Sequence, residues 1–238
     1  MKIHYVLFFV VCLCGVFFSC VTRNAILREH LSSLRSKDEV VIVILGDSIS
    51  GGGGISGTGS SYGSFLKPML GNLFTSRISL INTSREDESY RFAHRRIQED
   101  ILSYRPDIAF VMLGIVDAFT PGLLLSTHIN NVNNFYSILK DDGVFVIVLT
   151  TTWLRDVDSR NDSRYRRLNE FNDVIRDYAR YYHYPVIDVA QHMEKLMLSK
   201  PDEYRSLFSD AVLLNNEGKK FIADYIYQRF LNILDENH

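Results

Sequence analysis

Apolar residues along this chain form short unbroken runs that alternate with longer, helically spaced ones. The clearest short run, residues 40–45, contains only β-branched and aliphatic side chains and ends at Gly46-Asp47-Ser48. A run so short and so uniformly apolar is typical of a strand buried on both faces. We expect further strands at 78–81, 107–113, 144–151 and 185–189.

Between these runs, apolar residues recur at the three- and four-residue spacing of amphipathic helices. The pattern predicts helices near 62–74, 88–104, 129–141, 168–178 and 189–197, with a last helix from about residue 217. In the second of them, one stripe contains Phe92, Ala93, Ile97 and Ile101. Alternating strands and helices indicate a parallel sheet covered on both faces, which is a three-layer α/β/α sandwich.

Composition narrows the range of partners. The chain of 238 residues is 46% hydrophobic and has a formal net charge of −2, so we expect one main domain and no nucleic-acid-binding face. The glycine-rich stretch 50–63 lacks the P-loop lysine and the dinucleotide-binding spacing, so we expect no nucleotide cofactor. We interpret it as a mobile loop near the mouth of a site.

The N-terminus differs from the rest of the chain. Lys2 precedes an apolar run at 5–18, followed by Ser19-Cys20, and this length suits a signal-peptide core better than a membrane span. All three cysteines of the chain lie in this segment, so the domain after it cannot form an internal disulfide. We divide the chain into a signal peptide at 1–20, a tether at 21–38 and a domain at 39–238.

Cys20 after a small residue resembles the lipobox of bacterial lipoproteins, in which the cysteine is lipidated. An uncleaved membrane anchor is the alternative interpretation. Both predict an exported domain that is tethered to a membrane and lies outside the cytoplasm.

Ser48 follows directly after the first strand. In open α/β sheets, ligands bind at the carboxyl ends of the strands, where a serine hydroxyl can be exposed while its backbone is held. Gly46-Asp47-Ser48 is also compatible with a polar turn that only ends the strand. The residues at the ends of the later strands decide between a ligand site and a simple turn.

Four blocks at strand ends, in order, resemble the SGNH or GDSL hydrolases, a family of α/β/α esterases and lipases with a flavodoxin-like parallel sheet. The resemblance covers residues 40–232. The blocks are Gly46-Asp47-Ser48, Asn82-Thr83-Ser84, Gly114-Ile115-Val116-Asp117, and Asp210-Ala211-Val212-Leu213 followed by Asn215 and Gly218. The resemblance implies that Ser48 is the nucleophile, that Asp210 belongs to the triad, and that the amides of Ser48 and Ser84 form an oxyanion hole.

Two positions depart from the family pattern. Leu213 stands where the family has its catalytic histidine, and Val116 stands where it has the oxyanion asparagine. Leucine cannot accept a proton and valine cannot donate a hydrogen bond. Loss of one oxyanion donor costs about 10²–10³ in rate, and loss of a triad member costs about 10⁴–10⁶.

Among the histidines, His128 is the best candidate for a replacement base because it follows the loop after the third strand. His192, four residues after Asp188, is a weaker one. The mature chain has no Cys/His spacing typical of zinc, so we expect neither a metal nor a cofactor.

Two functions therefore stay open. The family resemblance implies a serine ester hydrolase or acyl transferase acting on acylated lipid, glycan or similar esters. The missing residues favour a catalytically inactive relative, a pseudoenzyme, that keeps the cleft to bind an acyl, glycan or protein partner.

Overall fold

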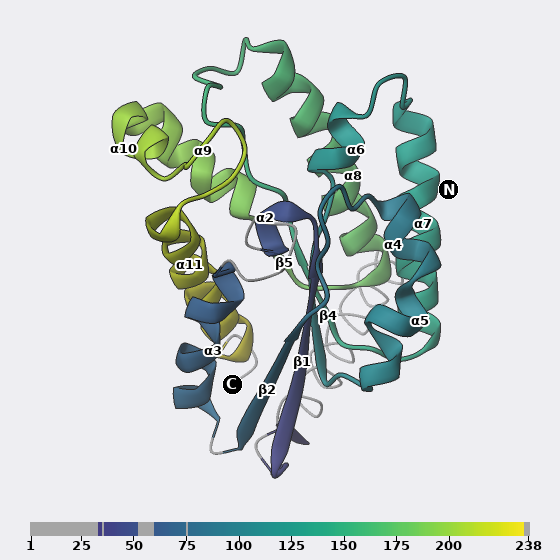
Figure 1. Ribbon diagram of the computed structural model, residues 1–238. Helices are drawn as coiled ribbons and strands as arrows, with labels where there is room; N and C mark the ends of the chain where they lie inside the picture. Colours follow the sequence, from purple (N-terminus) through teal and green to yellow (C-terminus); the bar gives the residue numbers. More distant parts are fainter. Residues whose placement is uncertain (1–32, 35, 52–59, 75, 236–238) are drawn as a thin grey trace, which may run out of the picture.

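A five-stranded parallel sheet forms the centre of the molecule, with strands in the order β2-β1-β3-β4-β5 (Figure 1). The computed structural model describes residues 33–34, 36–51, 60–74 and 76–235. The strands are β1 (Glu39–Gly46), β2 (Arg77–Asn82), β3 (Ile108–Met112), β4 (Val146–Leu149) and β5 (Val186–Ile187). This confirms the predicted parallel sheet and the α/β class. The direction of winding reverses between β1 and β3, which makes that edge the expected ligand site.

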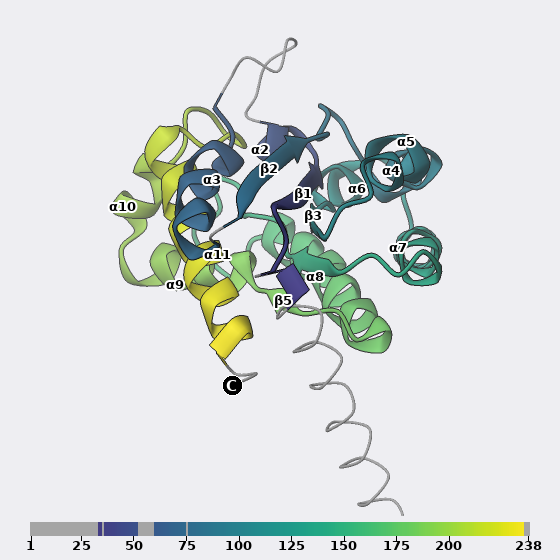
Figure 2. The same cartoon turned by 90° about the horizontal axis from the view of Figure 1, so that it is seen from below.

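Helices cover both faces of the sheet, as Figures 1 and 2 show. The longer helices are α3 (Tyr62–Leu73), α7 (Leu125–Asp141), α8 (Ser163–Tyr182), α9 (Val189–Ser199) and α11 (Asn216–Asp235). Shorter ones are α2 (Ser48–Gly51), α4 (Tyr90–Arg95), α5 (Ile97–Asp100), the 3₁₀ turn η1 (Leu102–Tyr104), α6 (Ile115–Phe119) and α10 (Pro201–Ser206).

The sheet separates two hydrophobic cores because successive strand residues point to opposite faces. In β1, Ile42 and Ile44 join the core under α3, α9 and α11, while Val43 and Leu45 join the core under α4, α5 and α7. Both β1 and β3 are buried on both sides. This burial explains why their sequences are continuously apolar.

The predicted helix at 88–104 is not continuous. It is divided into α4, α5 and η1 because Arg96 and Ile101 have non-helical backbone angles. Of the predicted stripe, Ala93, Ile97 and Ile101 are buried, but Phe92 is 50% exposed. The sequence prediction was therefore wrong about Phe92 and about the length of this helix.

The folded part of the chain begins before β1. Leu34 is fully buried in the core beside α3 and α11, and Lys37 pairs with Asp107. The end of the predicted tether thus packs against the domain. The predicted signal peptide, Cys20, most of the tether and residues 52–59 of the glycine-rich loop lie outside the described residues. Within the described ranges, no helix is both long and apolar enough to cross a membrane.

Candidate functional site

Ser48 begins α2 at the carboxyl end of β1, in the corner where the chain turns from strand to helix. Its side chain is partly exposed, whereas Asp47 before it is fully buried. Asp47 holds the turn: its Oδ1 accepts the backbone N–H of Ile49 at 3.0 Å, and its carbonyl accepts that of Gly51 at 2.8 Å. Gly46 is required here because a Cβ would lie 2.5 Å from the carbonyl oxygen of Met112. The local sequence therefore presents Ser48 on a rigid corner.

Burial changes the protonation of Asp47. Desolvation, with a further contribution from the nearby carboxylate of Asp117, raises the pKa of Asp47 from 3.8 to about 7. Its Oδ2 has no hydrogen-bond partner among the described residues. The carboxyl group beneath Ser48 thus titrates near neutral pH.

Asn82, at the end of β2, connects this corner to the second block. Its Nδ2 donates to the carbonyl of Ser50 at 2.8 Å, and its Oδ1 accepts the backbone N–H of Ser84 at 3.0 Å. The Ser84 amide, assigned by resemblance to the oxyanion hole, is therefore already hydrogen-bonded. Gly51 and Ser84 are close, since a Cβ on Gly51 would lie 3.7 Å from Ser84 Cβ. The second block thus lies beside α2.

The third block turns into α6 directly after β3. Val116 is partly buried and packs against the larger core, so this position supplies no side-chain donor. Asp117 is fully buried, and its Oδ2 accepts the backbone N–H of Tyr90 at 3.1 Å. This carboxylate holds the start of α4 against α6.

His128, the candidate replacement base, lies on α7 and is fully buried. Its Nδ1 is 3.5 Å from Asp117 Oδ1, and its ring lies 4.2 Å from the ring of Phe171. Neither ring nitrogen has a hydrogen-bond partner within the described part of the chain. The structure therefore brings His128 to Asp117 and shows no hydrogen bond from it to Ser48. His192 instead stacks on Tyr225, with ring centroids 3.9 Å apart.

The fourth block is a tight turn between α10 and α11. Asp210 is exposed, and its Oδ1 accepts the backbone N–H groups of Val212 at 2.8 Å and Leu213 at 2.7 Å. The carbonyl of Leu213 closes the turn by accepting from the N–H of Ser209 at 2.9 Å. Asp210 therefore hydrogen-bonds to its own turn, and the partly exposed side chain three residues later is aliphatic.

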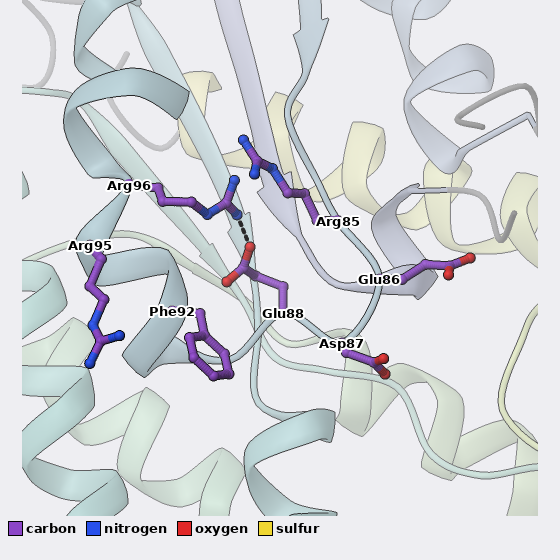
Figure 3. Close-up of a pocket in the computed structure, with 7 residues that line it drawn as sticks. All are labelled: Arg85, Glu86, Asp87, Glu88, Phe92, Arg95 and Arg96. Carbon is purple, nitrogen blue, oxygen red and sulfur yellow. Dashed lines mark ion pairs between the residues drawn. The ribbon is translucent and has the colours of Figure 1, made fainter. Parts of the chain in front are cut away.

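A pocket of about 270 Å³ lies beside the second block, between the loop after β2 and α4 (Figure 3). Arg85, the residue after Ser84, lines this pocket. Glu88, Phe92, Arg95 and Arg96 also line it. The backbone N–H of Arg85 donates to the carbonyl of Gly46 at 3.0 Å. This hydrogen bond connects the pocket to the turn after β1.

Sequence reasoning missed the roles of Asn82 and of the Asp117–His128 pair. The role of Asn82 was predictable from the sequence, because an Asn side chain at a strand end commonly hydrogen-bonds to the backbone two residues later. No sequence pattern indicates the Asp117–His128 pair, because the two residues lie on separate helices and meet only in the tertiary structure. Among the described residues, no group of three His, Cys, Asp or Glu side chains is arranged to hold a metal ion.

Solved structures with the same fold include several esterases. A lipase/acylhydrolase from Enterococcus faecalis is 19% identical, with a TM-score of 0.66, and the match covers 80% of this chain and 95% of that one. An acetylxylan esterase from Geobacillus stearothermophilus is also 19% identical, with a TM-score of 0.68 and coverages of 82% and 94%. An α/β hydrolase from the Lake Arreo metagenome is 23% identical, with a TM-score of 0.68 and coverages of 84% and 96%. At these identities the likeness establishes the fold.

Sequence comparison identifies the family. No curated protein matches the chain significantly. The model of the GDSL-like lipase/acylhydrolase family, however, matches residues 44–221, which include all four blocks. The family match agrees with the parallel sheet and with the position of Ser48 directly after the central strand β1. The chain therefore belongs to the GDSL-like lipase/acylhydrolase family.

Proposed function

We propose that this domain binds an acyl ester at the Ser48 edge of the sheet without hydrolysing it above the uncatalysed background. The observation that supports this proposal is in the fourth block, where Asp210 hydrogen-bonds to its own turn. The family resemblance assigns the base position in this block to Leu213, which cannot accept a proton. Without a proton acceptor beside it, the Ser48 hydroxyl is a weak nucleophile at neutral pH.

The oxyanion side supports the same proposal. The family places three donors there, and in this chain Val116 offers no side-chain donor while the Ser84 amide is bonded to Asn82. The Ser48 amide has no partner among the described residues and is the donor that stays available. Losses of one donor and of the base together predict a rate near the uncatalysed background.

A slow hydrolase is the second candidate, and the exposure of Ser48 favours it. Ser48 is partly exposed at the start of α2. Such a hydroxyl is free to reach an ester carbonyl. Under this candidate, His128 is the residue to test as base.

Hydrolysis of a 4-nitrophenyl butyrate solution by the full-length chain separates the two candidates. We expect the wild type and Ser48→Ala to be equally inactive, and we expect the double replacement Leu213→His with Val116→Asn to gain activity. The same double replacement on Ser48→Ala is the control and should stay inactive. Hydrolysis by the wild type that Ser48→Ala abolishes would reject the inactive domain, and loss of that activity in His128→Gln would identify the base.

We also propose that the domain is exported and held at a membrane, either by a lipid on Cys20 or by an uncleaved apolar segment at 5–18. The pattern of Lys2, the apolar run and Ser19-Cys20 supports this proposal. A tethered domain would meet ester groups of lipids or glycans near that membrane.

A further inference from the structure

A second pocket lies between α7 and α8, which pack side by side (Figures 1 and 2). It has a volume of about 400 Å³ and is lined by Asn133 of α7 and by Asp177, Tyr178 and Tyr181 of α8. Helix α8 ends shortly before β5 begins, so this end of the helix lies at the amino edge of the sheet. Ser48 follows the carboxyl end of β1, so the two sites lie at opposite edges. We call this second pocket the tyrosine pocket.

Tyrosine rings meet at steep angles in and beside the wall of the tyrosine pocket. Tyr181 is 71% exposed, and its ring is inclined by 70° to that of Tyr178, with centroids 6.3 Å apart. The ring of Tyr182 packs against that of Tyr181 at 5.0 Å and 89°. The Tyr182 hydroxyl donates to Asn133 Oδ1 at 2.7 Å, which holds this ring between the two helices. Rings at steep angles can contact a compact ligand group on two sides at once.

The same cluster of rings already attracts a cation within the protein. The ammonium of Lys140 lies 5.6 Å from the centre of the Tyr182 ring. The face of an aromatic ring is electronegative, and a cation within about 6 Å of the ring centre is attracted to it. Because Tyr178 and Tyr181 line an open pocket, they offer the same kind of surface to a cation from solution.

The charges around the tyrosine pocket also favour a cation. Asp177 is the charged residue among the four that line it. Tyr181 lies in the last turn of α8, where the helix dipole places partial negative charge. Arg180 pairs with Asp177 at 2.8 Å, but both side chains are largely exposed, at 73% and 66%. An ion pair so exposed to water is weak, so a ligand cation can compete for the Asp177 carboxylate.

The chemistry of the wall narrows the kind of cation. A small, strongly hydrated cation gains little from an aromatic surface, whereas the N-methyl groups of an alkylated ammonium also bury apolar area against it. An anion would be repelled by Asp177 and by the end of α8.

We propose that the tyrosine pocket binds an alkylated ammonium group, which lies against Tyr178 and Tyr181 with Asp177 as its counter-ion. Free choline-like compounds and the headgroups of choline lipids have this group in common. The site is independent of the proposed function, because it lies at the edge of the sheet opposite Ser48.

Titration of the full-length chain with choline tests the proposal. The chain is kept in a polyoxyethylene detergent, which contains no ammonium group, and saturation-transfer NMR on the N-methyl protons of choline measures the dissociation constant. The matched control ligand is the neutral analogue of choline in which a tert-butyl group replaces the trimethylammonium group. We expect choline to bind about tenfold more tightly than this alcohol.

Variants of the wall identify the site. Tyr181→Ala should weaken choline binding by about fivefold, and Tyr181→Phe should retain it because the ring face remains. Asp177→Asn should weaken choline binding, whereas Arg180→Gln should strengthen it by freeing the Asp177 carboxylate. Neither charge variant should change binding of the neutral analogue. Tyr104→Ala is the matched control, because Tyr104 is 42% exposed on η1 and does not line the pocket.

Several outcomes overturn the proposal. It fails if choline does not bind, or if the neutral analogue binds as tightly, since the pocket would then be only an apolar surface. It fails if Tyr104→Ala weakens choline binding as much as Tyr181→Ala does. It also fails if inorganic phosphate binds more tightly than choline, because the pocket would then be an anion site.

Glycerophosphocholine distinguishes the two sources of the ammonium group. Binding as tight as that of choline indicates a lipid headgroup, because the pocket then accommodates the phosphate. Binding weaker by about tenfold indicates a free ammonium compound, because Asp177 then repels the phosphate. Ser48→Ala should bind choline as the wild type does, whatever the ester assay shows, so failure of the ammonium site and failure of the proposed function are separate results.

Discussion

At the scale of single residues, the most unusual feature is a set of three buried polar side chains, one in the turn after β1, one on α6 and one on α7. Asp47, Asp117 and His128 are all fully buried, and each has at least one side-chain polar atom without a hydrogen-bond partner among the described residues. Such groups destabilise a fold and are usually kept where a site requires them. Here Asp47 accepts a backbone N–H in the turn after β1, and Asp117 accepts one at the start of α4.

Asp47→Asn is expected to change how stability depends on pH. The pKa of Asp47 is about 7 in the folded protein, compared with about 3.9 in an unfolded chain. The folded state therefore retains its proton while the unfolded state loses it, so the free energy of unfolding falls from about pH 4 to about pH 7 and then levels off. One pKa unit corresponds to about 1.4 kcal/mol, so the total decline should reach a few kcal/mol.

Urea denaturation at pH 5, 6, 7 and 8 measures this effect. Asparagine cannot ionise, so the variant should lose the part of the decline between pH 5 and 7 that Asp47 causes. Asp202→Asn is the control, because the Asp202 side chain is 99% exposed. An identical pH profile for wild type and Asp47→Asn would show that Asp47 does not titrate in this range.

At the scale of elements, the turn that presents Leu213 is joined to α11 by one side chain. Asn215 Oδ1 accepts the backbone N–H of Gly218 at 3.0 Å, and its Nδ2 donates to the carbonyl of Ser206 at 2.7 Å. Asn215 thus caps α11 and ties it to the end of α10. Gly218 packs closely beneath this cap, because a Cβ there would lie 2.2 Å from the carbonyl oxygen of Leu207.

Asn215→Ala should lower the free energy of unfolding by about 1–2 kcal/mol, since it removes the helix cap and a second hydrogen bond. Chemical denaturation measures the change. Asn130→Ala on the exposed side of α7 is the matched control and should have little effect. Equal values for the two variants would mean that the cap contributes nothing to stability.

At the scale of the whole molecule, α11 closes the fold by packing on α3 and the sheet. Phe230 is fully buried, and its ring lies 6.4 Å from that of Phe74 and 6.0 Å from that of Phe110. It therefore joins the last helix, the end of α3 and the central strand β3. The chain needs its C-terminal helix to complete the larger core.

Phe230→Ala should lower the free energy of unfolding by about 3–5 kcal/mol, because it leaves a cavity among three elements. Leu198→Ala, at a residue that is 48% exposed, is the control and should change stability by less than about 0.5 kcal/mol. A small effect of Phe230→Ala would show that α11 can close over the gap.

Cys20→Ser tests the proposed membrane attachment. In bacterial cells grown with a clickable palmitate, we expect the wild type to carry the label and to sediment with membranes. The variant should lose the label. If it still sediments, the apolar segment acts as an uncleaved anchor, and if the unmodified wild type is found in the soluble fraction, the tether proposal is wrong.

The sequence by itself determined the order of strands and helices, the parallel sheet and the place of Ser48, because these follow from local hydrophobic period and from turn residues. Only the tertiary structure decided that Phe92 is exposed, that Asn82 occupies the Ser84 amide and that His128 meets Asp117. Those facts depend on contacts between residues of separate elements, and the period of one segment contains no information about which side chains will meet across the fold.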